Sequence, residues 1–147
     1  MEASLHNRGR PETGMMKTLE LNHVALYVTD LKRSTEFYRR VLQLEPIPRP
    51  AFTFPGAWLF NYGLMIHIIG RETSNADARG SSGAIQTRDA HLALHADDLG
   101  AVEELLQQHG IAYRRNEVPD RKIKQLFFQD PDGFHIEVGT YPPLPPV

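Results

Sequence analysis

The sequence contains no cysteine among its 147 residues. This absence excludes disulfide bonds, thiolate metal sites and cysteine nucleophiles, and it is typical of a reducing compartment. Long apolar runs are also missing, since no stretch approaches the length of about 20 residues that a membrane-spanning helix needs. The polar first 16 residues lack the apolar segment of a secretion signal. We therefore expect a cytoplasmic protein that has no membrane partner.

Strong charge of one sign is lacking as well. The chain has 16 basic and 18 acidic residues, which gives a formal net charge of −2. Such a balance provides no whole-molecule attraction for the phosphates of nucleic acid. The hydrophobic share of 41% and the chain length are those of an ordinary globular protein with a real core. Nucleic acid is therefore excluded as an expected partner.

What the sequence does contain is an internal repeat. The segment 23–31 reads His-Val-Ala-Leu-Tyr-Val-Thr-Asp-Leu, and the segment 91–99 reads His-Leu-Ala-Leu-His-Ala-Asp-Asp-Leu. A second similarity closes each copy, because 63–67 and 133–137 both run from a glycine to a His or Glu four residues later. Each copy thus begins and ends on a potential metal ligand. This repeat is the main indication of function in the sequence.

The first copy predicts one strand, one helix and three further strands. Alternating apolar residues predict a strand over 19–29, and Asp30 is expected to cap a helix that continues to about residue 42. Prolines 46, 48 and 50 interrupt the chain, and Tyr62 with Gly63 supplies a turn. The three short strands are expected at 51–54, 57–61 and 64–69.

The second copy repeats this plan. It predicts a strand over 91–96, then a helix that is capped by Asp97 or Asp98 and ends at Gly110. Further strands are expected at 111–115, 124–129 and 134–139, with a turn at 130–133. The pattern βαβββ therefore occurs twice and predicts an α+β fold, in which the two modules form a curved mixed sheet around a metal-containing cavity.

These elements predict the domain organisation. We expect a flexible N-terminal extension over 1–18 and a proline-rich tail over 141–147. Between them lies a single domain over 19–140. It divides into a module over 19–70, a linker over 71–89 and a module over 90–140.

Strand alternation indicates which side chains share a face. His23 shares a face with Tyr27, and His91 shares one with His95, because successive side chains of a strand point to opposite sides. A single histidine on a strand is more often a hydrogen-bonded core residue than a metal ligand. Four candidates at equivalent points of a repeat favour a metal site, since burying several ionisable groups without a cation is costly. The candidates are His23, His67, His91 and Glu137.

Three imidazoles and one carboxylate suit a divalent metal ion such as Zn, Ni, Fe, Co or Mn. Tyr27, His95 and His135 are candidate substrate-binding residues beside that ion, with a role as cavity-lining residues as the alternative. A group of aromatic residues is a candidate binding wall, although alternation directs many of its members into the core. That group consists of Phe52, Phe54, Trp58, Phe60 and Tyr62.

Several of these segments resemble the vicinal oxygen chelate superfamily, which includes glyoxalase I, extradiol dioxygenases, fosfomycin thiol transferases and bleomycin-resistance proteins. The resemblance covers residues 19–140 and is carried by 21–26, 34–42 and 127–137, while 49–63 is similar to a glyoxalase-like branch. It implies that His23, His67, His91 and Glu137 occupy the metal positions. It also implies a homodimer, in which a site can draw ligands from both chains.

The chain departs from glyoxalase I at two of the positions that the resemblance carries over. Glyoxalase I usually has Glu at the position of His67, and the Arg that it uses for a glutathione carboxylate corresponds to Tyr27. The resemblance implies a metal-dependent lyase or isomerase that acts on a small hemithioacetal or hydroxycarbonyl through an enediolate. Glu137 would be the catalytic base, and a thiol such as glutathione is a candidate co-substrate.

Two alternatives belong to other functional classes. One is an Fe(II) ring-cleaving dioxygenase that uses His23, His91 and Glu137 as a facial triad, although His67 would crowd its open positions. The other is a non-enzymatic binder of small molecules like the bleomycin-resistance proteins, which commonly lack the metal ligands that this chain keeps. A stoichiometric metal ion in the protein would disfavour the binder.

Overall fold

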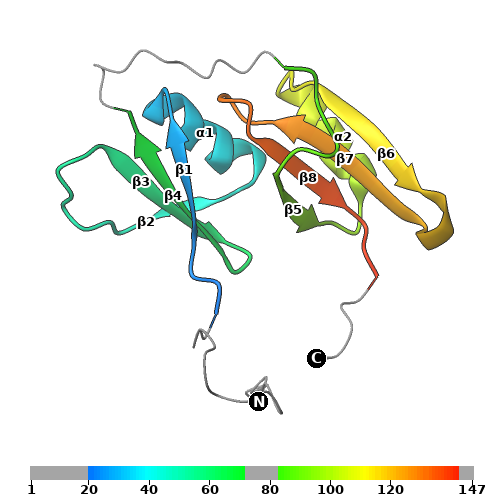
Figure 1. Cartoon of the computed structure of the whole chain (residues 1–147), viewed down its shortest axis with the longest axis horizontal. Coiled ribbons are helices and arrows are strands. Elements are labelled where there is room, and N and C mark those ends of the chain that lie inside the picture. Colours follow the sequence, from blue (N-terminus) through cyan, green and yellow to red (C-terminus); the bar gives the residue numbers. More distant parts are fainter. Residues whose placement is uncertain (1–19, 72–82, 143–147) are drawn as a thin grey trace, which may run out of the picture.

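The computed structural model describes residues 20–71 and 83–142, which form two modules of the same element order (Figure 1). The first module consists of β1 (Val24–Val28), α1 (Leu31–Val41), β2 (Glu45–Ile47), β3 (Gly56–Asn61) and β4 (Leu64–Gly70). The second consists of β5 (His91–His95), α2 (Leu99–Gln108), β6 (Tyr113–Val118), the 3-10 helix η1 (Pro119–Arg121), β7 (Ile123–Gln129) and β8 (His135–Gly139). Within these ranges no helix is both long and apolar enough to cross a membrane.

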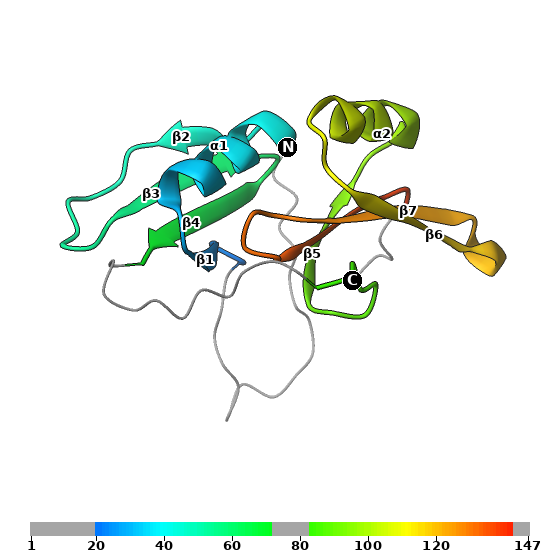
Figure 2. The same cartoon turned by 90° about the horizontal axis from the view of Figure 1, so that it is seen from above.

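Each module folds into its own four-stranded sheet, with the orders β1-β4-β3-β2 and β5-β8-β7-β6. In both sheets the first and last strands of the module pair in parallel, and the remaining pairs are antiparallel. Figure 2 shows both helices on the same side of the sheets. The prediction of an α+β fold built from two βαβββ modules is confirmed. The sheets are separate, however, and do not form one continuous curved sheet.

The two modules are equivalent residue by residue at their parallel pairs. Ala25 lies opposite His67 in the first sheet, and Ala93 lies opposite Glu137 in the second. The helices also begin alike, because the side chains of Asp30 and Asp98 accept the backbone N–H three residues later, at 2.9 and 3.1 Å. Such caps satisfy amide groups that have no partner inside the helix. The repeat in the sequence is therefore a repeat of structure.

The segment 45–55 differs from the prediction. The strand expected at 51–54 is absent, and a loop runs from 48 to 55 in its place. Strand β2 instead pairs with β3 as the outermost strand of its sheet, although it contains Pro46. An edge strand tolerates proline because its outward N–H needs no partner in the sheet. Strand β1 is also shorter than predicted, beginning at residue 24.

The core lies between the helices and the faces of the sheets that they cover. Its largest fully buried side chain is that of Tyr38 on α1, and Leu26 and Val28 of β1 point toward the same side. The alternate residues of β1, such as Tyr27, are exposed on the opposite face. Each sheet therefore has one face against its helix and an opposite face, termed the open face, as expected for a two-layer α+β module. On the second sheet this face is covered around Glu137, which is only 4% exposed.

The turn between β7 and β8 joins the second module to the first. The Tyr38 hydroxyl donates to Oδ2 of Asp130 at 2.8 Å, and both side chains are buried. Oδ1 of Asp130 accepts the backbone N–H groups of residues 132 and 134. Asp132 accepts the backbone N–H of Thr29 at 3.0 Å and the hydroxyl of Ser34 at 3.4 Å. Burial raises the pKa of Asp130. The hydrogen bonds that Asp130 accepts from Tyr38 and from the backbone of residues 132 and 134 partly oppose this rise.

We expect Tyr38→Phe to lower the free energy of unfolding by about 1–3 kcal/mol, because it leaves one oxygen of a buried carboxyl without its donor. Equilibrium unfolding in urea measures this loss. Tyr62→Phe is the matched control, since the Tyr62 hydroxyl also donates to a side chain, Gln43, but the residue is 63% exposed. Its change should stay within about 0.5 kcal/mol. Equal losses in both variants would contradict the assigned role of the buried bond.

Candidate functional site

The predicted metal ligands lie on the open faces of the two sheets. His23 precedes β1 directly, and His67 is on β4, so both belong to the first sheet. His91 begins β5 and Glu137 is on β8, so both belong to the second sheet. The structure thus brings the four residues together as two pairs, one pair on each module.

In the first pair, the ring of His67 is stacked between two other rings. The ring of Trp58, which lies opposite His67 on β3, is 4.1 Å away with an interplanar angle of 2°. The ring of His23 lies 3.7 Å away at 18°. Nε2 of His67 is also 3.3 Å from the sulfur of Met65. These contacts fix the plane of the His67 ring.

The environment of His67 keeps its imidazole neutral. Burial lowers the pKa of His67, and the nearby His23 and Arg49 lower it further. A neutral imidazole is the form that binds metal ions. The stacked rings of His23 and His67 cannot both coordinate one ion as they lie, because each nitrogen lone pair lies in its own ring plane. One of the two side chains has to turn for both to become ligands.

In the second pair, Glu137 is a buried carboxylate beside His91. Oε2 of Glu137 lies 2.7 Å from Nε2 of His91, and the Glu137 residue is only 4% exposed. Nδ1 of His91 is 2.7 Å from the carbonyl oxygen of Asp89, which assigns the Nδ1 proton to that bond. Oε1 of Glu137 accepts hydrogen bonds from Gln125 and from the hydroxyl of Tyr141. Burial and the hydrogen bond to Glu137 raise the pKa of Tyr141, so its hydroxyl stays protonated and acts as the donor.

The two pairs do not form one cluster in this chain. Among residues 20–71 and 83–142, no three His, Cys, Asp or Glu side chains are grouped so that they could hold one metal ion. The four-ligand metal site therefore stays a prediction, and each sheet carries two of its four candidate ligands.

The donor set nevertheless fits a divalent ion. Nδ1 of His23 is 2.8 Å from the side-chain oxygen of Asn22, and Nδ1 of His91 is 2.7 Å from a carbonyl oxygen. Nε2 of His23 is thus left for a ligand, whereas Nε2 of His91 would exchange its contact with Oε2 of Glu137 for the ion. A second partner that fixes the tautomer in this way is the usual companion of a metal-binding histidine. His67 is neutral, and Glu137 adds the single oxygen donor.

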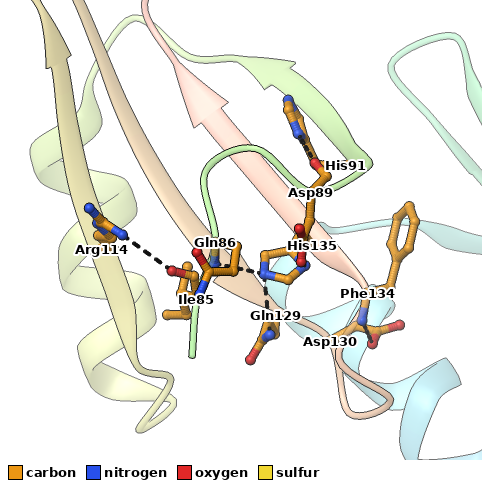
Figure 3. Close-up of polar contacts among 9 residues, drawn as sticks. All are labelled: Ile85, Gln86, Asp89, His91, Arg114, Gln129, Asp130, Phe134 and His135. Atoms are coloured by element: carbon orange, nitrogen blue, oxygen red, sulfur yellow. Dashed lines mark hydrogen bonds and ion pairs between the residues drawn. The ribbon is translucent and has the colours of Figure 1, made fainter. Parts of the chain in front are cut away.

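His135 lies on the same face of β8 as Glu137. Its side chain makes hydrogen bonds to neighbouring segments, which Figure 3 shows. Its ring is buried, and Nε2 accepts the backbone N–H of Gln86 at 3.0 Å, with Nε2 of Gln129 at 3.3 Å. Nδ1 is 3.9 Å from the carboxylate of Asp89. His135 thus ties the segment before β5 to the second sheet. Its predicted role in substrate binding stays a prediction.

Tyr27 and His95 occupy equivalent exposed positions, at the far ends of β1 and β5 from the predicted ligands. The ring of Tyr27 is 56% exposed and lies 4.9 Å below the guanidinium of Arg71. Nε2 of His95 is 3.3 Å from Asp97, and its ring meets the ring of Tyr141 at 90°. Both residues face the open side of their sheets, where a substrate could reach them.

The expectation that many aromatic residues of 52–62 enter the core is wrong. Leu59 is the fully buried residue of β3, so the residues that alternate with it point to the open face. Arg49 lies 4.8 Å above the ring of Phe52 and donates to the carbonyl of Phe54, which orders the loop beside Trp58. Trp58 is half-buried, and four aromatic side chains are exposed. These four are Phe52, Phe54, Phe60 and Tyr62.

Sequence reasoning named Trp58 only as part of a binding wall, and it missed Gln125 and Tyr141, which both donate to Glu137. The period of two along β8 was a usable signal for Tyr141, because residues 137, 139 and 141 share one face if the chain stays extended. The contact of Gln125 depends on the pairing of β7 with β8, which alternation within one strand does not reveal.

The chain is similar to one known family and to a named relative. Residues 20–138 match the family model described as the glyoxalase/bleomycin resistance protein/dioxygenase superfamily. The chain is 38% identical over 130 residues to an Arabidopsis thaliana protein named glyoxylase I 4, which covers 86% of this chain and 74% of the relative.

Two solved structures illustrate the shared fold. The fosfomycin resistance protein FosX from Listeria monocytogenes, crystallised with Mn(II) and 1S,2S-dihydroxypropylphosphonic acid, has a TM-score of 0.68 and 18% identity, and covers 86% of this chain and 95% of its own. Lactoylglutathione lyase from Agrobacterium tumefaciens has a TM-score of 0.62 and 24% identity, and covers 84% and 95%. Likeness at these identities shows the fold and not the reaction.

The stacking of His67 on Trp58 provides a reporter for metal binding, because Trp58 is the single tryptophan of the chain. We expect Zn²⁺ to produce a saturable change in tryptophan fluorescence, since metal binding at His67 brings a cation to the ring that is stacked on Trp58. His67→Ala should abolish this change. His109→Ala is the control, because His109 is exposed at the end of α2. A saturable change that persists unaltered in His67→Ala would contradict the assignment of His67 as a ligand.

Proposed function

The chain belongs to the glyoxalase/bleomycin resistance protein/dioxygenase superfamily, and on that basis we propose that it is a metal-dependent, glyoxalase-like lyase or isomerase. The proposed substrate is a small α-oxygenated compound, such as the hemithioacetal that an α-oxoaldehyde forms with a thiol like glutathione. The likeness to glyoxylase I 4 supports this reaction class. A divalent ion held by His23, His67, His91 and Glu137 would supply Lewis acidity to two adjacent substrate oxygens.

The observation that carries the proposal is the state of Glu137. This carboxylate is buried, has one oxygen fixed by two donors, and keeps the other beside His91 on the open face of the sheet. A carboxylate held in this way is a suitable general base, because its reactive oxygen needs no reorganisation before proton transfer.

In the proposed reaction, Glu137 would give up its place as a ligand, and its Oε2 takes the proton from the carbon that bears the thiol and returns it to the neighbouring carbonyl carbon. The hydroxyl proton of the first carbon moves to the oxygen of the second. The product is a thioester of a hydroxy acid. The atoms balance within the substrate, and no oxidant or reductant is consumed.

We also propose that the site is completed in a homodimer, with the first module of one chain facing the second module of the other. The two ligand pairs lie on separate sheets, so a second chain is a direct way to bring a histidine pair to a His–Glu pair. The open faces support this arrangement because they expose large apolar groups, such as Tyr27 at 56% and Phe60 at 45%.

Replacing the proposed base tests the reaction. We expect the metal-loaded protein to convert methylglyoxal and glutathione into a thioester, and Glu137→Gln to lower kcat by about 10²- to 10⁴-fold. Glu117→Gln is the control, because Glu117 is an exposed glutamate on β6. Full activity in Glu137→Gln would remove the base. A wild-type protein that forms no thioester with any of the five ions, but consumes oxygen with a catechol, would favour the dioxygenase.

Mixing two inactive variants tests whether the site is shared between chains. In a heterodimer of His23→Ala and Glu137→Gln chains, a shared arrangement places both lesions in one site and leaves the other intact. Subunit exchange should therefore restore about a quarter of the wild-type activity, since about half of the dimers are mixed and each has one working site. A monomeric protein, or mixtures that stay inactive after proven exchange, would contradict the shared site.

A further inference from the structure

The hydrogen bonds on Glu137 come from two residues that have no part in the metal set. Oε1 of Glu137 accepts from Nε2 of Gln125 on β7 and from the hydroxyl of Tyr141, which follows β8. Oε2 is the oxygen that faces Nε2 of His91. The two oxygens of one buried carboxylate are thus distinguished by their partners, because the donors to Oε1 leave Oε2 for another ligand.

The position of Tyr141 depends on Gly139, two residues earlier in the chain. Thr140 continues the pairing with β7, since its backbone N–H donates to the carbonyl of Lys124 at 3.0 Å. Residues 137, 139 and 141 therefore share the open face, and the ring of Tyr141 lies directly over Gly139. A Cβ at Gly139 would come within 2.8 Å of the ring and its hydroxyl. The Tyr141 ring also contacts the ring of His95 edge to face, with the centroids 5.8 Å apart.

The orientation of Gln125 is fixed by a neighbour as well. Nδ2 of Asn116 on β6 donates to Oε1 of Gln125 at 2.6 Å. Because the oxygen of this amide is already an acceptor, its nitrogen is the end that meets Glu137. Gln125 also lies opposite Gly139 in the ladder between β7 and β8. A chain of hydrogen bonds thus runs across the open face from Asn116 through Gln125 to Glu137.

We propose that Gln125 and Tyr141 are positioning residues that hold Glu137 with Oε2 toward His91, and that they thereby set the affinity of the site for a divalent ion. This inference rests on the proposed function, because it assumes that Glu137 is a ligand. A carboxylate that can rotate has to be ordered again for each binding event, whereas the held carboxylate presents one oxygen in one place. Residues in this relation to a metal ligand typically change metal affinity about 10- to 100-fold when they are replaced.

Metal affinity of the full chain tests the proposal directly. Zn²⁺ dissociation constants, measured by competition with a chromophoric chelator, should rise about 10-fold in Tyr141→Phe and in Gln125→Met, and about 100-fold in the double variant. Tyr113→Phe is the control, because the half-buried Tyr113 also has a hydrogen-bonded hydroxyl, with Gln107 as its partner. Its affinity should stay within about twofold of the wild type.

Two further readouts separate positioning from a general loss of structure. Thermal unfolding without metal should leave each single variant folded at the assay temperature. In metal-saturated protein, kcat should fall more than KM changes, since the direction of the Glu137 oxygen matters most during proton transfer. Because the two substitutions act on different elements, a folding defect in one leaves the other as the test.

The outcomes distinguish this inference from the proposed function. Unchanged Zn²⁺ affinity in both folded variants would overturn the positioning role, while the lyase proposal would stand. Weaker Zn²⁺ binding in both variants of a protein that forms no thioester would support the positioning role and overturn the lyase. A wild-type chain that binds no divalent ion would overturn both.

Discussion

The parallel pairing of the first and last strand in each module is the constraint on which the candidate site depends. It places His67 opposite Ala25 and Glu137 opposite Ala93, so the closing candidate of each module lies beside a small residue near the opening one. A slip of one residue would turn these side chains toward the helix and into the core. The apolar residues that alternate with them hold the register, because they are buried under the helices.

The turn at 130–133 gives the two modules a defined contact within one chain. Asp130 and Asp132 accept hydrogen bonds from α1 and from Thr29, which follows β1, and the buried bond from Tyr38 is the central one. A buried carboxyl is tolerated only where donors surround it, which makes the contact specific.

The chemistry of the site follows from what surrounds each titratable group. His67 stays neutral because it is stacked among rings and lies near a cation, which suits a metal ligand. Glu137 is held at one oxygen by two donors and faces His91 with the other, which suits a base or a ligand of fixed direction. The structure therefore gives two residues of the same predicted set different environments, each with its own physical cause.

The sequence by itself determined the duplication, the element order and the identity of the four candidate ligands, because repeats and period-two alternation are local properties of the chain. It also determined the start of the first helix at Asp30 and narrowed the second to Asp97 or Asp98, of which Asp98 is the cap. It misplaced the strand near Pro46 because edge position is a property of the assembled sheet. Only the tertiary structure decided that the candidate ligands form two pairs, and that Gln125 and Tyr141 donate to Glu137. Those contacts depend on strand order and module placement, which involve residues far apart in the chain.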